Sequence, residues 1–229
     1  IVKQGDVVVM VIPIDYTLPS RKLILSQVHM IREALDENAV VTVCREKELA
    51  STLNNLKSYP DLVIVDSNSV TRIAEDIPAK IKFTTFSLII ARHRGDLPLF
   101  IKGLKKIDGL KNGDKVLIAE VCSHHTPEDD IGTIKIPKWL RSYTKKELQI
   151  DIIHNSELPD NLSDYKLVVH CGGCLLTHRA MQTRINEAKL MDVPVVTYGV
   201  ITSFMHGAIP RALVPFADAF AEWGKVKSK

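Results

Sequence analysis

Cysteine is scarce in this sequence, with 4 residues among 229, and no apolar run approaches the ~20 residues that a membrane span requires. Four cysteines in a chain of this length do not make a disulfide framework, so we expect free thiols in a reducing cytoplasm. Neither sign of charge dominates, since 30 Lys and Arg face 27 Asp and Glu and are divided evenly along the chain. These absences argue against a membrane protein and against a nucleic-acid-binding protein.

Nucleotide-binding motifs are absent as well. The sequence has no G-x-x-x-x-G-K-[ST] and no G-x-G-x-x-G, the two glycine-rich loops that cradle phosphates. What remains is an ordinary globular composition, 45% apolar and 25% charged, which predicts one large or two small domains. The chain begins at Ile1 and not at a methionine, so we expect it to be part of a longer protein.

Apolar runs rich in β-branched residues alternate with helical patterns along the chain. The runs predict strands at 7–14, 39–44, 62–66, 84–90, 115–122, 148–153, 166–171 and 193–198. The clearest helical pattern begins at Ser20, and its stripe of Ile24, Val28, Ile31 and Leu35 is expected to face a sheet. Strands that are apolar throughout and alternate with helices predict an α/β fold of open sheets with mainly parallel strands.

The charged stretch "RHRGDLP", residues 92–98, separates the first four predicted strands from the last four. It divides the chain into two consecutive α/β domains, residues 1–95 and 96–229. The first carries no recognisable chemistry, because its one thiol, Cys44, closes an apolar strand and is interpreted as a small buried hydrophobe. We therefore predict that the first domain serves oligomerisation.

The other three cysteines follow two predicted strands of the second domain. Cys122 ends "KVLIAEVC", Cys171 ends "KLVVHC", and Cys174 comes after Gly172 and Gly173. Ligands of open parallel sheets bind beyond the carboxyl ends of the strands, so the thiols converge if these strands are neighbours. The glycines allow backbone N–H groups to approach a sulfur cluster, and the dipole of the following helix favours thiolates.

Three kinds of site compete for these thiols. A thioredoxin-like dithiol would use Cys171 and Cys174, but it needs no third cysteine at another strand end. A structural zinc site could use all three with a histidine, although such sites usually show two close ligand pairs. An iron–sulfur cluster with three cysteines and an open or non-cysteine fourth position fits their count and placement best.

The fourth position has two candidates in the loop after Cys122. His124 lies on the same face as the thiol if the chain stays extended, and Glu128 could bring a carboxylate oxygen to iron. His170 is adjacent to Cys171 and points away from it, so we interpret it as a packing group or a residue that supports the cofactor site.

The motifs "CSHH" and "HCGGC" resemble the C-x-H and H-C-x-x-C signature of HydF, the maturation GTPase of FeFe-hydrogenases. The resemblance continues through "KVLIAEVCSHHTPEDDIGTIKIPKWLR" and "VPVVTYGV" and covers essentially the whole chain. HydF proteins have a GTP-binding domain, a dimerisation domain and a cluster-binding domain. The resemblance implies that residues 1–95 and 96–229 are the last two, with GTP bound only by a domain that is missing.

The resemblance also implies a scaffold or carrier and not an enzyme. A 4Fe-4S cluster would be held by Cys122, Cys171 and Cys174 with an exchangeable fourth ligand. A cytoplasmic homodimer would accept a diiron precursor from radical S-adenosylmethionine maturases and pass it to apo FeFe-hydrogenase. The residues by themselves still leave a thiol oxidoreductase using Cys171 and Cys174, or a zinc-binding module, as alternatives.

Overall fold

The computed structural model describes residues 1–13, 23, 25–121, 130–154, 157–173 and 176–227. The first sheet has the order β2-β1-β3-β4 and consists of β1 (Val7–Val11), β2 (Val40–Cys44), β3 (Leu62–Val65) and β4 (Phe83–Thr85). The second sheet has the order β6-β5-β7-β8 and consists of β5 (Lys115–Ala119), β6 (Gln149–Ile153), β7 (Leu167–His170) and β8 (Val195–Thr197).

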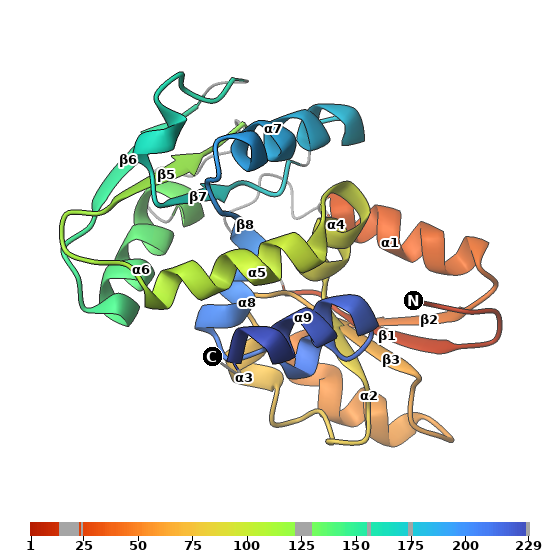
Figure 1. The fold of residues 1–229 in the computed structure, drawn as a ribbon. Helices are drawn as coiled ribbons and strands as arrows, with labels where there is room; N and C mark the ends of the chain where they lie inside the picture. The colour runs from red at the N-terminus through yellow and green to blue at the C-terminus, as the bar shows by residue number, and fades with distance from the viewer. Residues whose placement is uncertain (14–22, 24, 122–129, 155–156, 174–175, 228–229) are drawn as a thin grey trace.

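Every neighbouring pair of strands in both sheets is parallel. The helices are α1 (Leu25–Asp36), α2 (Leu49–Asn55), α3 (Val70–Ile73), α4 (Phe86–Arg94), α5 (Leu97–Asp108), α6 (Ile136–Thr144), α7 (His178–Leu190), α8 (Tyr198–Met205) and α9 (Ala217–Lys227). Figure 1 shows the sheets in two halves of the molecule, with α4, α5 and α8 between them. The predicted fold class, two α/β units with parallel sheets, is confirmed.

The side chains of β1 show how the core is organised. Val9 and Val11 point into a large apolar cluster that also contains Val168 of the second sheet, whereas Val8 and Met10 belong to a smaller cluster on the other face. This alternation follows from the two-residue period of a strand. Because the large cluster runs through both sheets, the two units pack against each other directly.

The predicted strand 84–90 is wrong beyond Thr85, where α4 begins. The Thr85 hydroxyl accepts a hydrogen bond from the Leu88 N–H at 3.1 Å and caps the helix. Leu88 and Ala91 are buried in the large cluster that both halves share, and Phe86 is buried in the smaller cluster of the first unit, so this short helix carries the same apolar run as a buried strand. Within the charged stretch 92–98, Arg92, His93 and Arg94 form the last turn of α4, and Asp96 caps α5, which begins at Leu97.

The apolar stripe expected on α1 is also partly wrong. Met30 and Ala34 pack against the first sheet, while Val28 and Leu35 are 44% and 53% exposed. The helix has apolar residues on two faces, and the face with the small Ala34 lies against the strands. Ile24 lies outside the described residues.

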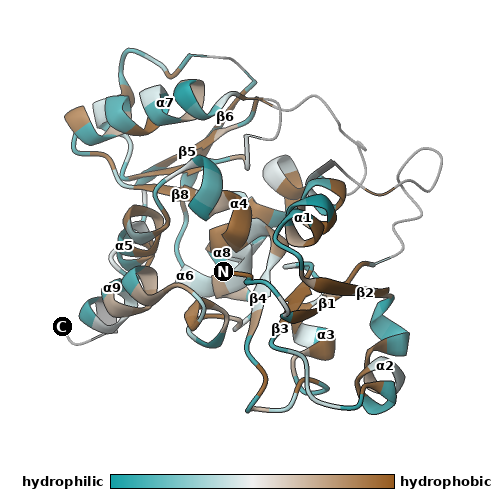
Figure 2. Ribbon diagram, turned by 90° about the vertical axis from the view of Figure 1, so that its right-hand side faces the viewer, coloured by the Kyte–Doolittle hydropathy of each residue, from teal (hydrophilic) through white to brown (hydrophobic). Residues whose placement is uncertain are grey.

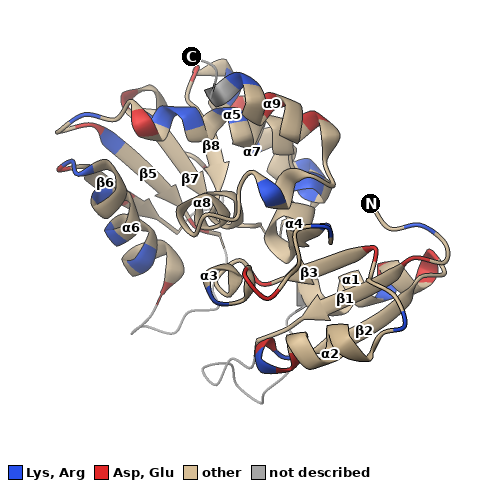
Figure 3. Cartoon of the chain, turned by 90° about the horizontal axis from the view of Figure 1, so that it is seen from below, with Lys and Arg blue, Asp and Glu red and all other residues tan. Residues whose placement is uncertain are grey.

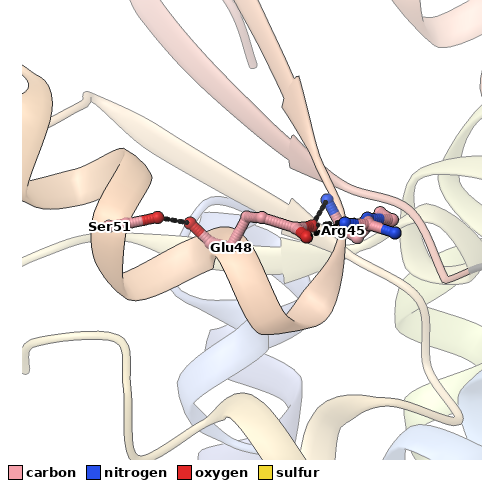
Figure 4. Close-up of polar contacts among 3 residues, drawn as sticks. All are labelled: Arg45, Glu48 and Ser51. Atoms are coloured by element: carbon pink, nitrogen blue, oxygen red, sulfur yellow. Dashed lines mark hydrogen bonds and ion pairs between the residues drawn. The ribbon is translucent and has the colours of Figure 1, made fainter.

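The end of β2 is fixed by a local cap. The Glu48 carboxylate accepts bonds from the backbone N–H of Arg45 at 3.2 Å and from its Nε at 2.7 Å. The Ser51 hydroxyl donates to the carbonyl of Glu48 at 2.9 Å, at the start of α2 (Figure 4). The bond from the Arg45 N–H to the Glu48 carboxylate is the acidic half of a capping box, and it lies where the chain passes from β2 through the short 3-10 helix Glu46–Glu48 into α2.

Charged residues of both signs are spread over both halves of the molecule in the view of Figure 3. This distribution agrees with the balanced composition. None of the helices in the described part of the chain is long and apolar enough to pass through a membrane.

Candidate functional site

The two strands that lead into the cysteine motifs are neighbours. β5 and β7 pair in parallel, with Ala119 opposite His170. The pairing continues one residue further, because the N–H of Cys171 donates to the carbonyl of Ala119 at 2.9 Å. Both strands therefore end at the same edge of the sheet, where open parallel sheets bind ligands.

Cys171 occupies the centre of this edge. Its side chain is 3% exposed, and its Sγ accepts a hydrogen bond from the N–H of Val121 at 3.3 Å. A backbone N–H aimed at sulfur favours the anionic thiolate over the thiol. Val121 directly precedes Cys122 in the sequence, so the contact joins the two segments that carry the predicted ligands.

Four predicted ligands, Cys122, His124, Glu128 and Cys174, lie outside the described residues. Within the described ranges, no three His, Cys, Asp or Glu side chains lie together as a metal site. Cys171 is the predicted metal ligand whose surroundings the structure shows.

His170 is buried beneath this edge, with 2% of its surface exposed. The Nε of Arg184 donates to its Nε2 at 2.6 Å, and its Nδ1 lies 2.7 Å from the carbonyl oxygen of Cys171. Because a guanidinium can only donate, Nε2 must accept, and the ring proton belongs on Nδ1, which donates to Cys171. The imidazole is then neutral, with both nitrogens engaged.

Arg184 contacts this candidate site, and the sequence analysis did not select it. It is 4% exposed and lies on the buried face of α7 with Met181, Ile185 and Ala188. Burial lowers the pKa of its guanidinium, while the charges of Cys171 and Glu187 raise it. A buried cation beside a thiol stabilises the thiolate. The available signal was a charged residue within the apolar stripe of a helix.

One of the two glycines after Cys171 has a backbone conformation that favours glycine. Gly173 is buried and has a φ of +65°, in the left-handed region that favours glycine, and Gly172 is half-buried. The carbonyl of Gly173 accepts a bond from the N–H of Leu176 at 2.9 Å. Thr177 then caps α7 through a bond from the N–H of Ala180 at 3.2 Å.

Glu120 is a second residue that the sequence analysis did not select. It follows β5 directly, is 5% exposed, and its Oε2 lies 3.5 Å from Nδ1 of His154, beyond the end of β6. A carboxylate directly after a run of buried apolar residues was the available signal. The same edge of the sheet thus holds a carboxylate–imidazole pair next to the strand that leads to Cys122.

Comparison with protein-family models gave two matches, which together span most of the chain. Residues 1–95 match the Hydrogen maturase F dimerization domain, and residues 98–215 match the Hydrogen maturase F tetramerization domain. The chain belongs to the hydrogen maturase F family. The resemblance drawn from the cysteine motifs is thereby confirmed, and membership of this family assigns the chain a role in hydrogenase maturation. A comparison with curated proteins found no match.

Both matched domains of the hydrogen maturase F family are named for self-association. Self-association is therefore a property of this chain, in agreement with the expectation that it oligomerises. A tetramerization domain in the second half was not foreseen, because the sequence analysis assigned that half to ligand binding alone.

Proposed function

We propose that residues 96–229 form the iron–sulfur domain of a scaffold protein, in which Cys122, Cys171 and Cys174 hold a 4Fe-4S cluster. The observation that carries this proposal is the hydrogen bond from Val121 to the sulfur of Cys171. It brings the end of β5, which continues into Cys122, against the thiol at the end of β7. Val121 and Cys171 are 50 residues apart in the sequence, so the pairing of β5 with β7 brings together two segments that are distant along the chain.

The described residues suit a cluster of this charge and kind. Thiolates are the ligands that iron–sulfur clusters use, and N–H donors to sulfur stabilise them. Arg184 supplies a buried positive charge next to the negative thiolates. When bound, the cluster would supply one iron whose ligand is not a thiolate and can exchange. We propose His124 or Glu128 as the residue that occupies this position.

His170 has a supporting role in this arrangement. Its Nε2 is engaged by Arg184, and its Nδ1 is directed to the backbone of Cys171. Both ring nitrogens therefore form hydrogen bonds within the protein, and the side chain holds the peptide unit of Cys171 in place. We propose that it orients the thiolate without being a ligand.

We further propose that the protein is a carrier and not an enzyme. Its cargo is the diiron precursor, which it accepts from radical S-adenosylmethionine maturases and delivers to apo FeFe-hydrogenase. A bridging ligand of the cargo can displace a weak oxygen or nitrogen donor while the three thiolate bonds stay intact. Membership of a hydrogenase maturation family supports this role.

For self-association we propose an apolar surface on the first unit as the contact with a second copy of the chain. On the edge strand β2, Val40 and Val43 are 58% and 47% exposed. Val28 and Leu35 of the neighbouring helix α1 are also exposed. β2 is brown, hydrophobic, along most of its length in Figure 2. The match of residues 1–95 to a dimerization domain supports this occupant, and exposed edge strands pair readily.

Replacing the thiols one at a time tests the cluster site. Cys122→Ala, Cys171→Ala and Cys174→Ala should each lose the cluster after anaerobic iron and sulfide reconstitution. Cys44→Ala is the matched control, because Cys44 lies on β2 of the other sheet and burial raises the pKa of its thiol. We expect the control to keep its full iron and sulfide content.

The two alternatives predict other results. If Cys122→Ala leaves the reduction potential of a Cys171–Cys174 disulfide as in the parent, the protein is a thiol oxidoreductase. Stoichiometric zinc without sulfide would make the thiols structural. The carrier role is tested by adding the maturase-loaded protein to apo-hydrogenase and measuring hydrogen evolution, which Cys171→Ala should not support.

A further inference from the structure

Arg94 connects the first unit to the segment that follows Cys171. It is the last residue of α4, yet its Nη1 donates to the carbonyl of Gly173 at 2.9 Å and to that of Leu176 at 2.6 Å. In return, Nε2 of Gln182 on α7 donates to the carbonyl of Arg94 at 3.4 Å. One side chain from residues 1–95 thus holds the backbone carbonyls of both Gly173 and Leu176.

The contact is chemically suited to fixing the backbone. Gly173 has a left-handed φ of +65°, and its carbonyl already accepts the N–H of Leu176 at 2.9 Å. The guanidinium adds two charge-assisted bonds, which are stronger than bonds between neutral groups. Arg94 is half-buried, so water competes for these bonds less than at an open surface. Gly173 and Leu176 are therefore held by the hydrogen bond between them and by a residue from outside the second unit.

Arg94 is also part of a path that leads back to α1. It lines a small open pocket between α1 and α4, together with His29, Met30, Glu33 and His93. The opposite face of α1 carries the exposed residues of the proposed contact with a second copy. Arg94 thus borders both the pocket between α1 and α4 and the backbone of Gly173 and Leu176.

We propose that Arg94 is a positioning residue, through which the first unit fixes the backbone at Gly173 and Leu176, and so the geometry in which the cysteine thiolates hold iron. The inference rests on the proposed cluster site, because without a cluster these two residues would need no such control. It predicts that loss of Arg94 leaves the ligands in place but changes how firmly and in what geometry they hold iron.

Arg92 provides a matched control for the test. It lies two residues earlier in the last turn of α4 and also joins the units, through an ion pair with Asp218 of α9 at 2.6 Å. It has no hydrogen bond to residues 173–176 among those that the structure shows. Arg94→Gln and Arg92→Gln each remove one arginine and one contact between the units from the same turn, but only Arg94→Gln removes the bonds to Gly173 and Leu176.

Amide hydrogen exchange of the cluster-free protein is the first measurement. Arg94→Gln should raise exchange in the peptide that covers residues 172–177 about tenfold, the effect expected when one net charge-assisted bond of ~1.4 kcal/mol is lost. Arg92→Gln should exchange like the parent. Arg94→Lys should fall between the two, because an ammonium is a compact point charge that lacks the planar fork of a guanidinium.

The second measurement uses the reconstituted protein. Arg94→Gln should bind as much iron as the parent, but with a changed EPR signature and faster iron loss to a chelator. If its exchange and its spectrum both match those of Arg92→Gln, the inference is overturned. If the hydrogen exchange of Arg94→Gln changes as expected while the parent protein takes up no iron, the positioning role of Arg94 is supported and the proposed cluster function fails.

Discussion

Replacing Gly173 by alanine tests the backbone conformation at the centre of the site. A non-glycine residue in the left-handed region costs ~1–2 kcal/mol, and the stiffer unfolded chain returns ~0.4–1 kcal/mol. Space adds little, because an added Cβ would meet Met181 Sδ at 3.4 Å and Leu176 Cδ1 at 3.6 Å, ordinary contacts. We therefore expect Gly173→Ala to lower the free energy of unfolding by about 1 kcal/mol, or the melting temperature by ~2–4 °C.

Gly207→Ala is the control for this prediction. Gly207 also has a positive φ, +74°, and no atom lies within 4 Å of its added Cβ. The two variants should be destabilised to a similar extent in urea unfolding, but only Gly173→Ala should lose iron faster after reconstitution. Full stability of Gly173→Ala would refute the left-handed conformation. A loss above ~3 kcal/mol would show that the space around Gly173 is tighter than the structure has it.

Three further predictions concern the charge beside the thiol, the association surface and the alkaline limb of stability. Arg184→Met should make the reduction potential of the cluster more negative, because a nearby cation stabilises the reduced state. A redox titration measures this potential, and Arg184→Lys should stay nearer the parent. An unchanged potential in Arg184→Met would contradict the prediction. Val43→Glu should lower the molecular mass measured by light scattering, because contact with a second copy would bury the new charge. Phe220→Glu, which lies outside both family matches, should leave the mass unchanged. Equal masses for the two variants would refute the proposed association surface. Burial, followed by the hydrogen bond to Asp151, raises the pKa of Tyr165 to about 12 from 10.0, so its contribution to stability is present below pH ~10 and is lost as the pH rises towards ~12. Tyr165→Phe should therefore flatten the fall of the unfolding free energy over that range, and an unaltered slope would disprove the role of this phenol.

The fold could be predicted from the sequence where both the length and the composition of an apolar run were typical of a strand. β5 and β7 are mostly buried apolar runs that contain β-branched residues and lie between helical patterns, so their type and their parallel pairing follow from the pattern. The run from Thr84 to Ile90 misled because the first turns of α4 are buried or half-buried and apolar apart from Ser87, and the exposed charged residues come only in its last turn. Its capping residue, Thr85, was the sign that a helix begins there.

The site could be predicted only in part. The spacing of the cysteines marks them as candidate ligands, but the residues that contact the site cannot be found from spacing. Arg184 lies 14 residues after His170, and Arg94 lies 79 residues before Gly173. No periodicity links residues so far apart, because such contacts arise from the packing of α4 and α7 around the strand ends.

Iron, sulfide and zinc analysis of the anaerobically reconstituted protein, with an EPR spectrum of the reduced sample, tests the central claim most directly. The account predicts about four irons and four sulfides per chain and a reducible cluster signal. Stoichiometric zinc without sulfide, or a metal-free reversible disulfide between Cys171 and Cys174, would contradict it.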